Sequence, residues 1–224
     1  MTTPERTEGR KSGQTKSDIA YESIKEKILE GDLPPHADIR EEALQHELAL
    51  SRTPIREACQ RLCKEGFLQI YPSKGMFVTD VTAELIRDIY QMRLLNEPFI
   101  VREACRFNEQ MGWFRDIRQR IAAPPSGLGE RELRRYFIDL DRDLHDYLLR
   151  GCRNRFLLTA MSMVLDHNHR IRIKVSRPYD PEDRSVGEHL DIIDAVLARD
   201  EGRAEEAARR HIEASRQITF KYFL

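Results

Sequence analysis

The stretch LSRTPIREACQRLCKEGFLQIYPSKGMFV, residues 50–78, carries the clearest structural pattern of this 224-residue chain. In its first half, apolar residues recur at the i, i+3, i+4, i+7 and i+8 positions that form one buried face of a helix. Ser51 or Thr53 can cap the start of that helix, and Pro54 suits its first turn, where no N–H group is needed for a helical hydrogen bond. Gly66 then ends the helix.

The second half of this stretch predicts a β-hairpin. Two short runs of β-forming residues, 67–71 and 76–78, flank the turn residues 72–75. Before residue 50, apolar spacing predicts two more helices, over 17–31 and 40–48, which are separated by the two-proline turn GDLPPHAD. Three helices followed by a hairpin is the element order of a winged helix-turn-helix.

The exposed face of the third predicted helix suits DNA. Its apolar stripe faces the core, so Thr53 and Arg56 remain outside and Arg52 lies at the amino end. Helix N–H groups and arginine meet phosphates, and arginine can bind guanine with two hydrogen bonds. Lys74 and Gly75 at the wing tip can approach the DNA backbone or minor groove. The alternative is that these arginines form only a solvated surface, which the net charge of −1 for the whole chain neither supports nor excludes.

After residue 81 the chain has helical periodicity almost throughout, which predicts an all-α antiparallel bundle. A very short turn between the last two helices favours their antiparallel pairing. The predicted helices cover residues 83–108, 109–122, 130–150, 154–174, 182–199 and 203–223. The fold is therefore expected to be mainly α, with a disordered arm at 1–16, a winged helix at 17–80 and a helical domain at 81–224.

The bulk composition agrees with a two-domain cytoplasmic protein. Residues are 40% hydrophobic and 33% charged, which is ordinary for a soluble globular chain. No apolar run approaches the ~18 residues that span a bilayer, and the N-terminus lacks the apolar core of a signal peptide. The four cysteines have no metal-finger or redox spacing, so we expect Cys59 and Cys63 to be small buried residues.

Four polar residues lie on apolar helix faces of the C-terminal half. In the 130–150 helix, Asp141 and His145 are i, i+4 neighbours at the border of the apolar stripe. His189 and His211 lie among apolar residues of the last two helices. Each alone fits a satisfied core residue, but burying an unpaired aspartate is costly. A bound metal would satisfy all four, and three imidazoles with one carboxylate suit Zn²⁺, Ni²⁺ or a similar divalent ion.

Other polar residues of this half are less specific. His167 and His169 are two positions apart and so lie on different helix faces, which indicates surface residues or residues that support the ligands. Arg93, Arg170 and Arg172 could bind a carboxylate with two hydrogen bonds. Surface ion pairing is the more common role for arginine, and it is the interpretation that we favour for these three.

The N-terminal pattern is recognisable. Residues 50–78 closely resemble the GntR family of bacterial regulators, whose signature is an SRTPVREAL-like helix, an EG turn and a wing that ends in G-x-F-V. The resemblance extends over about 21–78, and His36 stands where the family usually has a glycine after proline. It implies that the amino end of the recognition helix and the wing contact operator DNA. The residues implicated are Ser51, Arg52, Thr53, Arg56, Lys74 and Gly75.

The C-terminal half resembles the FCD ligand-binding domain of the FadR-type GntR subfamily, over about residues 83–220. The similar pieces are DRDLHDYLLRGCRN, EHLDIIDAV and GRAEEAARRHIEAS, with Leu144 in place of the usual phenylalanine. In many such domains an Asp-x-x-x-His pair and two later histidines hold a divalent metal, and a small carboxylate effector completes its coordination. The matching ligands are Asp141, His145, His189 and His211.

Together these patterns predict a DNA-binding transcriptional regulator, most simply a repressor, that binds double-stranded operator DNA as a homodimer. A small organic acid is the expected effector, with Arg93 as a candidate contact. Three alternatives stay open: a metal-responsive regulator in which the ion is the signal, a helical metallohydrolase with metal-activated water, and an acyl-CoA sensor that does not need the Asp/His set. No serine or cysteine nucleophile accompanies the set, so we predict that the protein is not an enzyme.

Overall fold

A computed structural model of the chain describes residues 14–175 and 184–223. They form two compact units that divide between Asp80 and Val81. Most of the predicted arm at 1–16 lies outside the described residues, but Lys16 already belongs to the first helix. The predicted break at 176–183 also lies outside them. Among the helices that the structure describes, none has the length and apolar character needed to cross a membrane.

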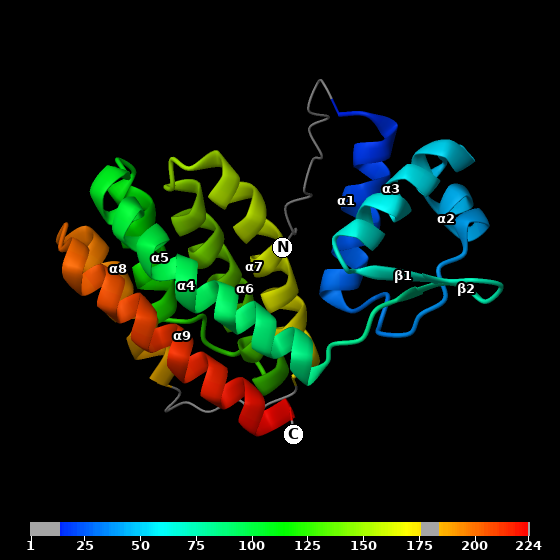
Figure 1. Ribbon diagram of the computed structural model, residues 1–224. Helices are drawn as coiled ribbons and strands as arrows, with labels where there is room; N and C mark the ends of the chain where they lie inside the picture. Colours follow the sequence, from blue (N-terminus) through cyan, green and yellow to red (C-terminus); the bar gives the residue numbers. More distant parts are fainter. Residues whose placement is uncertain (1–13, 176–183, 224) are drawn as a thin grey trace, which may run out of the picture. The chain divides into compact units, whose positions relative to one another are not determined.

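The N-terminal unit is the predicted winged helix, with three helices and an antiparallel hairpin (Figure 1). Its elements are α1 (Lys16–Glu30), α2 (Glu41–Leu48), α3 (Arg52–Lys64), β1 (Leu68–Tyr71) and β2 (Gly75–Val78). The hairpin register pairs Leu68 with Val78 and Tyr71 with Gly75. A single bridge from Asp38 to Phe77 places the segment before α2 beside β2.

The core of this unit follows from the apolar stripe of α3. Ile55, Ala58 and Leu62 have no solvent exposure and belong to the same apolar cluster as Ile24 of α1. Cys59 lies in this cluster too, and burial raises the pKa of its thiol to about 12. The cysteine is therefore a small apolar residue of the core, as the sequence predicts, and not a reactive thiolate.

Two of the positive-φ positions in this unit, His36 and Gly75, bear on the turns that the sequence analysis singles out. His36, which replaces a family glycine, has φ 67°, and its N–H donates to the carbonyl oxygen of Val78 at 2.9 Å. The turn therefore keeps its shape without glycine, at the modest cost of left-handed backbone for a residue with a Cβ. Gly75 at the wing tip has φ 112°, a region that L side chains rarely adopt. Glycine is required at that position.

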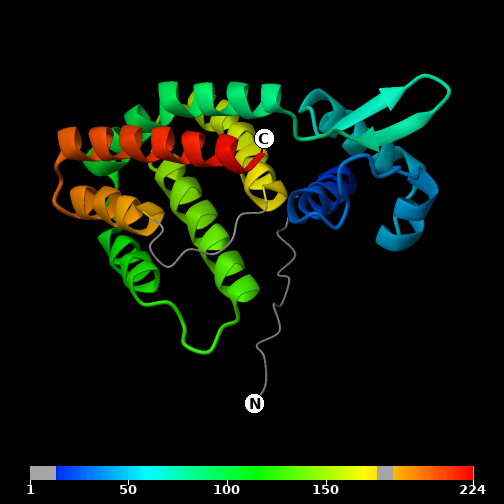
Figure 2. The same cartoon turned by 90° about the horizontal axis from the view of Figure 1, so that it is seen from below.

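The C-terminal unit is a helical bundle. Its helices are α4 (Ala83–Phe107), α5 (Met111–Ala122), α6 (Glu130–Arg150), α7 (Arg155–Lys174), α8 (Arg184–Leu197) and α9 (Glu201–Phe223). Helices α8 and α9 form the expected antiparallel pair, and α9 lies alongside α4 in both views (Figures 1 and 2). Helix α4 also packs against α6, α7 and α8, so it is the helix around which the bundle is built.

Candidate metal centre and DNA-reading surface

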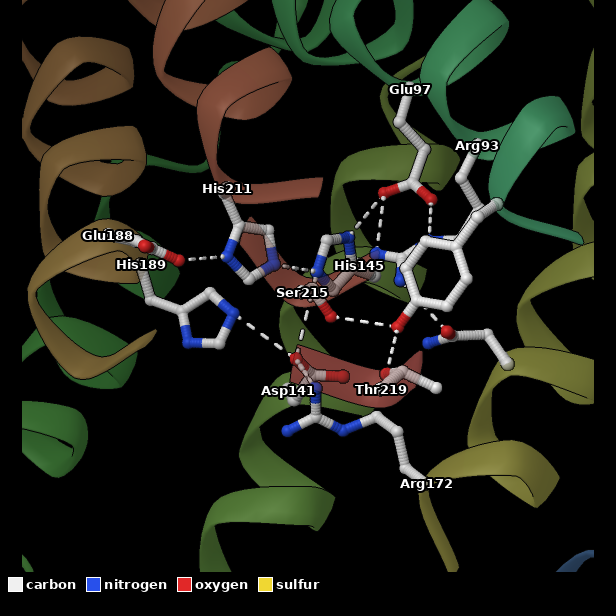
Figure 3. Close-up of polar contacts among 12 residues, drawn as sticks. Arg93, Glu97, Asp141, His145, Arg172, Glu188, His189, His211, Ser215 and Thr219 are labelled. Atoms are coloured by element: carbon white, nitrogen blue, oxygen red, sulfur yellow. Dashed lines mark hydrogen bonds and ion pairs between the residues drawn. The ribbon is translucent and has the colours of Figure 1, made fainter. Parts of the chain in front are cut away.

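The four predicted ligands come together inside the C-terminal unit (Figure 3). Their ligand atoms lie within 4.8 Å of one another, and none of the four residues is more than 6% exposed. Asp141 and His145 are one turn apart on α6, so their side chains project from the same face. His189 on α8 and His211 on α9 meet them because those two helices pack as an antiparallel pair.

Two of the imidazoles face each other with their Nε2 atoms, which are 3.3 Å apart. The Nδ1 atom of His145 lies 2.7 Å from Glu97 Oε2, and the Nδ1 atom of His211 lies 3.0 Å from Glu188 Oε2. Each carboxylate can accept only an N–H, so the Nδ1 atoms carry the protons and the Nε2 atoms of neutral rings present lone pairs. Two such lone pairs repel unless a proton or a metal cation lies between them.

The remaining pair of ligand atoms, Asp141 Oδ1 and His189 Nε2, lacks hydrogen bonds. Asp141 Oδ1 lies 3.2 Å from His189 Nε2 and 3.2 Å from Arg172 Nη1, but neither Asp141 Oδ1 nor His189 Nε2 makes a hydrogen bond to any described residue. The same oxygen lies 3.9 Å from His145 Nε2. Buried polar atoms without a hydrogen bond are rare in folded proteins. The four ligand atoms lie within 4.8 Å of one another, and a cation among them would satisfy all four.

The electrostatics favour the protonation states that a metal requires. Burial opposes ionisation of Asp141, but Arg172 and the neighbouring imidazoles outweigh it and hold the pKa of that carboxyl well below its usual range. Burial, together with His189 and His145, keeps the pKa of His211 well below that of a free imidazole. Burial likewise lowers the pKa of His189, although Asp141 acts in the opposite direction. An ionised carboxylate and neutral imidazoles are the forms that bind metals.

The donor set and its spacing fit a borderline divalent ion. Two nitrogens held at ~2.0–2.1 Å by one ion are ~2.8–3.4 Å apart in six- to four-coordinate geometry, a range that includes the 3.3 Å between His145 and His211. Metal-bound histidines usually donate their second N–H to a carboxylate, which is the role that Glu97 and Glu188 have here.

Glu97 is a functional residue that the sequence pattern did not predict. On α4 it forms a buried ion pair with Arg93, whose Nη1 also donates to Asn168 Oδ1 at 2.8 Å. Burial alone would raise the pKa of Glu97, but Arg93 and His145 lower it to about 2. Glu97 follows Arg93 by four positions on the buried face of α4, and that spacing of opposite charges on an apolar stripe was the signal that could have revealed it.

The structure corrects two predictions about exposure. Arg93, Arg170 and Arg172 are not surface residues: the first two are at most 3% exposed, and the Arg172 side chain is 15% exposed. His167 and His169 are also buried, at 4% and 3% exposure, so a surface position is wrong for both. The physical reason for the α7 residues is that α4 and α6 both pack against this helix. Arg93 is linked to the ligand set through Glu97, which contacts His145.

The predicted DNA-contacting residues are exposed in the N-terminal unit. Ser51 precedes α3 and makes no side-chain hydrogen bond to the described helix, and the first turn of α3 contains no acidic residue. The N–H groups at the amino end of α3 are therefore available to a phosphate. Lys74 and Gly75 are exposed at the wing tip. A surface hollow of about 320 Å³ is lined by Arg52, Thr53, Arg56, Glu57 and Gln60.

Comparisons with known proteins match both units. Residues 16–78 match the bacterial regulatory proteins of the gntR family, and residues 88–214, more than half of the chain, match the FCD domain. The chain is 29% identical over 184 residues to the Nta operon transcriptional regulator of Aminobacter aminovorans, covering 80% of this chain and 82% of that protein. It is 23% identical to the transcriptional repressor RspR of Escherichia coli K12, over 88% of each chain.

A solved structure supports the fold. A putative GntR transcriptional regulator from Rhodococcus sp. RHA1 superposes with a TM-score of 0.75 at 19% identity, covering 93% of this chain and 99% of that one. The relatives are transcriptional regulators, not enzymes. With a winged helix that matches one family and a helical unit that matches the other, this chain belongs to the FCD-containing GntR regulators and is a DNA-binding transcriptional regulator.

Proposed function

We propose that this regulator holds one divalent metal ion at Asp141, His145, His189 and His211, and that a small organic acid bound at that ion controls its affinity for operator DNA. The observation that carries the proposal is that the Nε2 atoms of His145 and His211 face each other 3.3 Å apart while both Nδ1 atoms lie within hydrogen-bond distance of carboxylates. Zn²⁺ and Ni²⁺ suit three imidazoles and a carboxylate best.

A purely structural cluster explains this arrangement less well. A polar core network pairs each donor with an acceptor, because an unmatched buried group costs about 1–3 kcal/mol. Here the Nε2 atoms of His145 and His211 can pair only if one ring carries a second proton, and Asp141 Oδ1 and His189 Nε2 lack a hydrogen bond to the described residues. Carboxylates on the outer nitrogens of two rings add the support that metal-bound histidines usually have.

We infer an organic acid because the four protein ligands leave coordination positions of the ion free. Four protein ligands do not complete the shell of a five- or six-coordinate ion, and carboxylate oxygen is a suitable additional ligand. When bound, the ion supplies a fixed positive charge that attracts the acid. A small cavity between α6 and α7 includes Asp141, His145 and Asn168 in its lining, but its volume of about 10 Å³ holds no more than one water, so an acid needs side chains beside the ligands to move.

The site contacts α4, the helix that follows the wing. Glu97 of α4 holds His145, and Tyr90 of α4 hydrogen-bonds to Ser215 and Thr219 of α9 at 2.9 and 2.8 Å. Helix α4 begins at Ala83, soon after β2 ends. A change in packing around the ion can therefore shift α4, and a short segment of chain joins α4 to the unit that reads DNA. Allosteric coupling of this kind is typically 1–3 kcal/mol.

In this proposal, the amino end of α3 reads the operator and the wing contacts the adjacent backbone or minor groove. The residues in these roles are Ser51, Arg52, Thr53, Arg56, Lys74 and Gly75. The protein acts as a homodimer on a two-fold operator, because one winged helix covers only a short site. Repression is the expected direction, supported by the repressor RspR among its relatives.

Operator binding by fluorescence anisotropy tests the proposal. At saturating Zn²⁺, the operator affinity should change when a candidate acid is added, and metal alone should not reproduce the change. The buried position of all four ligands favours one rival, in which the ion itself is the signal. That rival predicts an affinity that follows the metal concentration and ignores every acid.

A further inference from the structure

Arg172 of α7 contacts the proposed metal centre directly. Its Nη1 atom lies 3.2 Å from Asp141 Oδ1, the same oxygen that lies 3.2 Å from His189 Nε2. Figure 3 shows Arg172 and His189 reaching this aspartate from different helices. The guanidinium therefore occupies the one carboxylate oxygen that is directed at the imidazoles.

A metal ion and this guanidinium compete for the oxygen. A bound ion would lie ~2.0–2.2 Å from Asp141 Oδ1, which leaves two positive charges on one buried atom. Their repulsion is weakly screened because Asp141 is only 3% exposed. Arginine cannot relieve the repulsion by losing a proton. Metal binding therefore favours departure of the Arg172 side chain from this oxygen.

The side chain of Arg172 can move while its backbone stays in place. Its Nε atom is buried and makes no hydrogen bond to any described residue, so departure from Asp141 breaks no further contact there. The carbonyl oxygens of Arg172 and Val175, in contrast, accept hydrogen bonds from Arg134 Nη2 at 3.2 and 2.8 Å. The end of α7 is anchored, and the guanidinium is the part that is free to change partner.

We propose that Arg172 exchanges partners: in the metal-free domain it is the counter-ion of Asp141, and in the metal-loaded domain its displaced guanidinium holds the carboxylate of a small acid that binds at the ion. This inference rests on the proposed function and names the residue that recognises the acid. The planar guanidinium suits a carboxylate because it can donate two parallel hydrogen bonds.

The effect of removing Arg172 on metal affinity has a diagnostic sign. A residue that merely supports a ligand lowers metal affinity when it is removed, by about 10–100-fold. A competitor raises the affinity, here by about tenfold or more, because a neighbouring opposite charge stabilises a carboxylate by one to three pK units. Arg172→Gln therefore separates the two roles. Lys174→Gln is the matched control, since Lys174 is exposed on the same helix and its removal also deletes one positive charge.

The experiment measures Zn²⁺ affinity of the full chain by competition with a chromogenic chelator, with and without acetate or malonate. We expect Arg172→Gln to bind Zn²⁺ about tenfold more tightly than wild type without acid, and Lys174→Gln to match wild type. With acid, wild type should retain Zn²⁺ more tightly by linkage, and Arg172→Gln should lose this gain. The combination of tighter metal binding and a lost acid response is specific to partner exchange.

The results that would contradict this inference can be told apart from one another. Weaker or unchanged Zn²⁺ binding by Arg172→Gln overturns the inference, as does a normal acid response in that variant. If wild type binds no Zn²⁺ or Ni²⁺ at all, the metal centre itself is wrong and the inference falls with it. If Arg172→Gln is unfolded in EDTA, the ion should restore its circular dichroism, because it replaces the missing charge beside Asp141; failure to refold contradicts the inference.

Discussion

The carboxylate of Glu97 sets the state of His145. By accepting the Nδ1 proton at 2.7 Å, it fixes the ring so that Nε2 is the atom available to a ligand. We predict that Glu97→Gln lowers Zn²⁺ affinity by about 10–100-fold, because a neutral amide neither holds the ring as firmly nor increases its basicity. Chelator competition measures the change.

The control for this variant is Glu103→Gln, on the same helix but only partly buried. It should leave the metal affinity unaltered. Equal affinities for Glu97→Gln and wild type, with both proteins folded by circular dichroism, would show that Glu97 does not support the ligand.

Arg52 and Arg56 are the residues on which we expect sequence reading of the operator to depend most. Both are exposed at the amino end of α3, although Arg52 Nε also lies 3.3 Å from Glu41 Oε2. We predict that Arg52→Ala or Arg56→Ala weakens operator binding by about 1–3 kcal/mol if the lost contact is a two-bond contact to a base. Lys64→Ala, near the other end of α3, is the control. Fluorescence anisotropy that gives wild-type affinity for both arginine variants would remove α3 as the reading helix.

The same glycine-to-alanine substitution is expected to have opposite effects on stability in the wing and in α5. Gly75→Ala forces a side chain into φ 112° and should lower the free energy of unfolding of the N-terminal unit by about 1–2 kcal/mol. Gly112→Ala, inside α5 where an added Cβ meets no described atom within 4 Å, should stabilise the helix by up to about 1 kcal/mol. Urea denaturation followed by circular dichroism compares the variants. A stabilising Gly75→Ala would mean that the wing turn is not built as described.

Helix positions were readable from the sequence because the cues are local. The apolar spacing and the capping residues predicted α4 over 83–108, and the structure has Ala83–Phe107. Asp141 and His211 were found because a polar residue on an apolar stripe is conspicuous. Glu97 was not found, since its partner His145 is far away along the chain and only packing brings them together. The burial of α7 on several sides is likewise a property of the bundle and not of the helix.

At the scale of the whole molecule, a chain with net charge −1 binds a polyanion through local placement of charge. The exposed basic residues of the N-terminal unit include Arg52, Arg56 and Lys74. Two such units bound to one two-fold operator increase the number of phosphate contacts, so we predict a homodimer whose half-sites are about one helical turn, ~34 Å, apart. Light scattering that shows a monomer, both free and on DNA, would contradict this assembly.

The central claim is the metal ion, and its stoichiometry is the most direct measurement of it. Elemental analysis should find one Zn²⁺ or Ni²⁺ per chain in the gently purified or reloaded protein. His189→Ala should lose the ion, because the three remaining ligands bind a divalent ion more weakly than four. The N-terminal unit of this variant should stay folded and bind the operator. A wild-type protein that cannot be loaded with a divalent ion, or a His189→Ala variant that retains a full equivalent, would contradict the account.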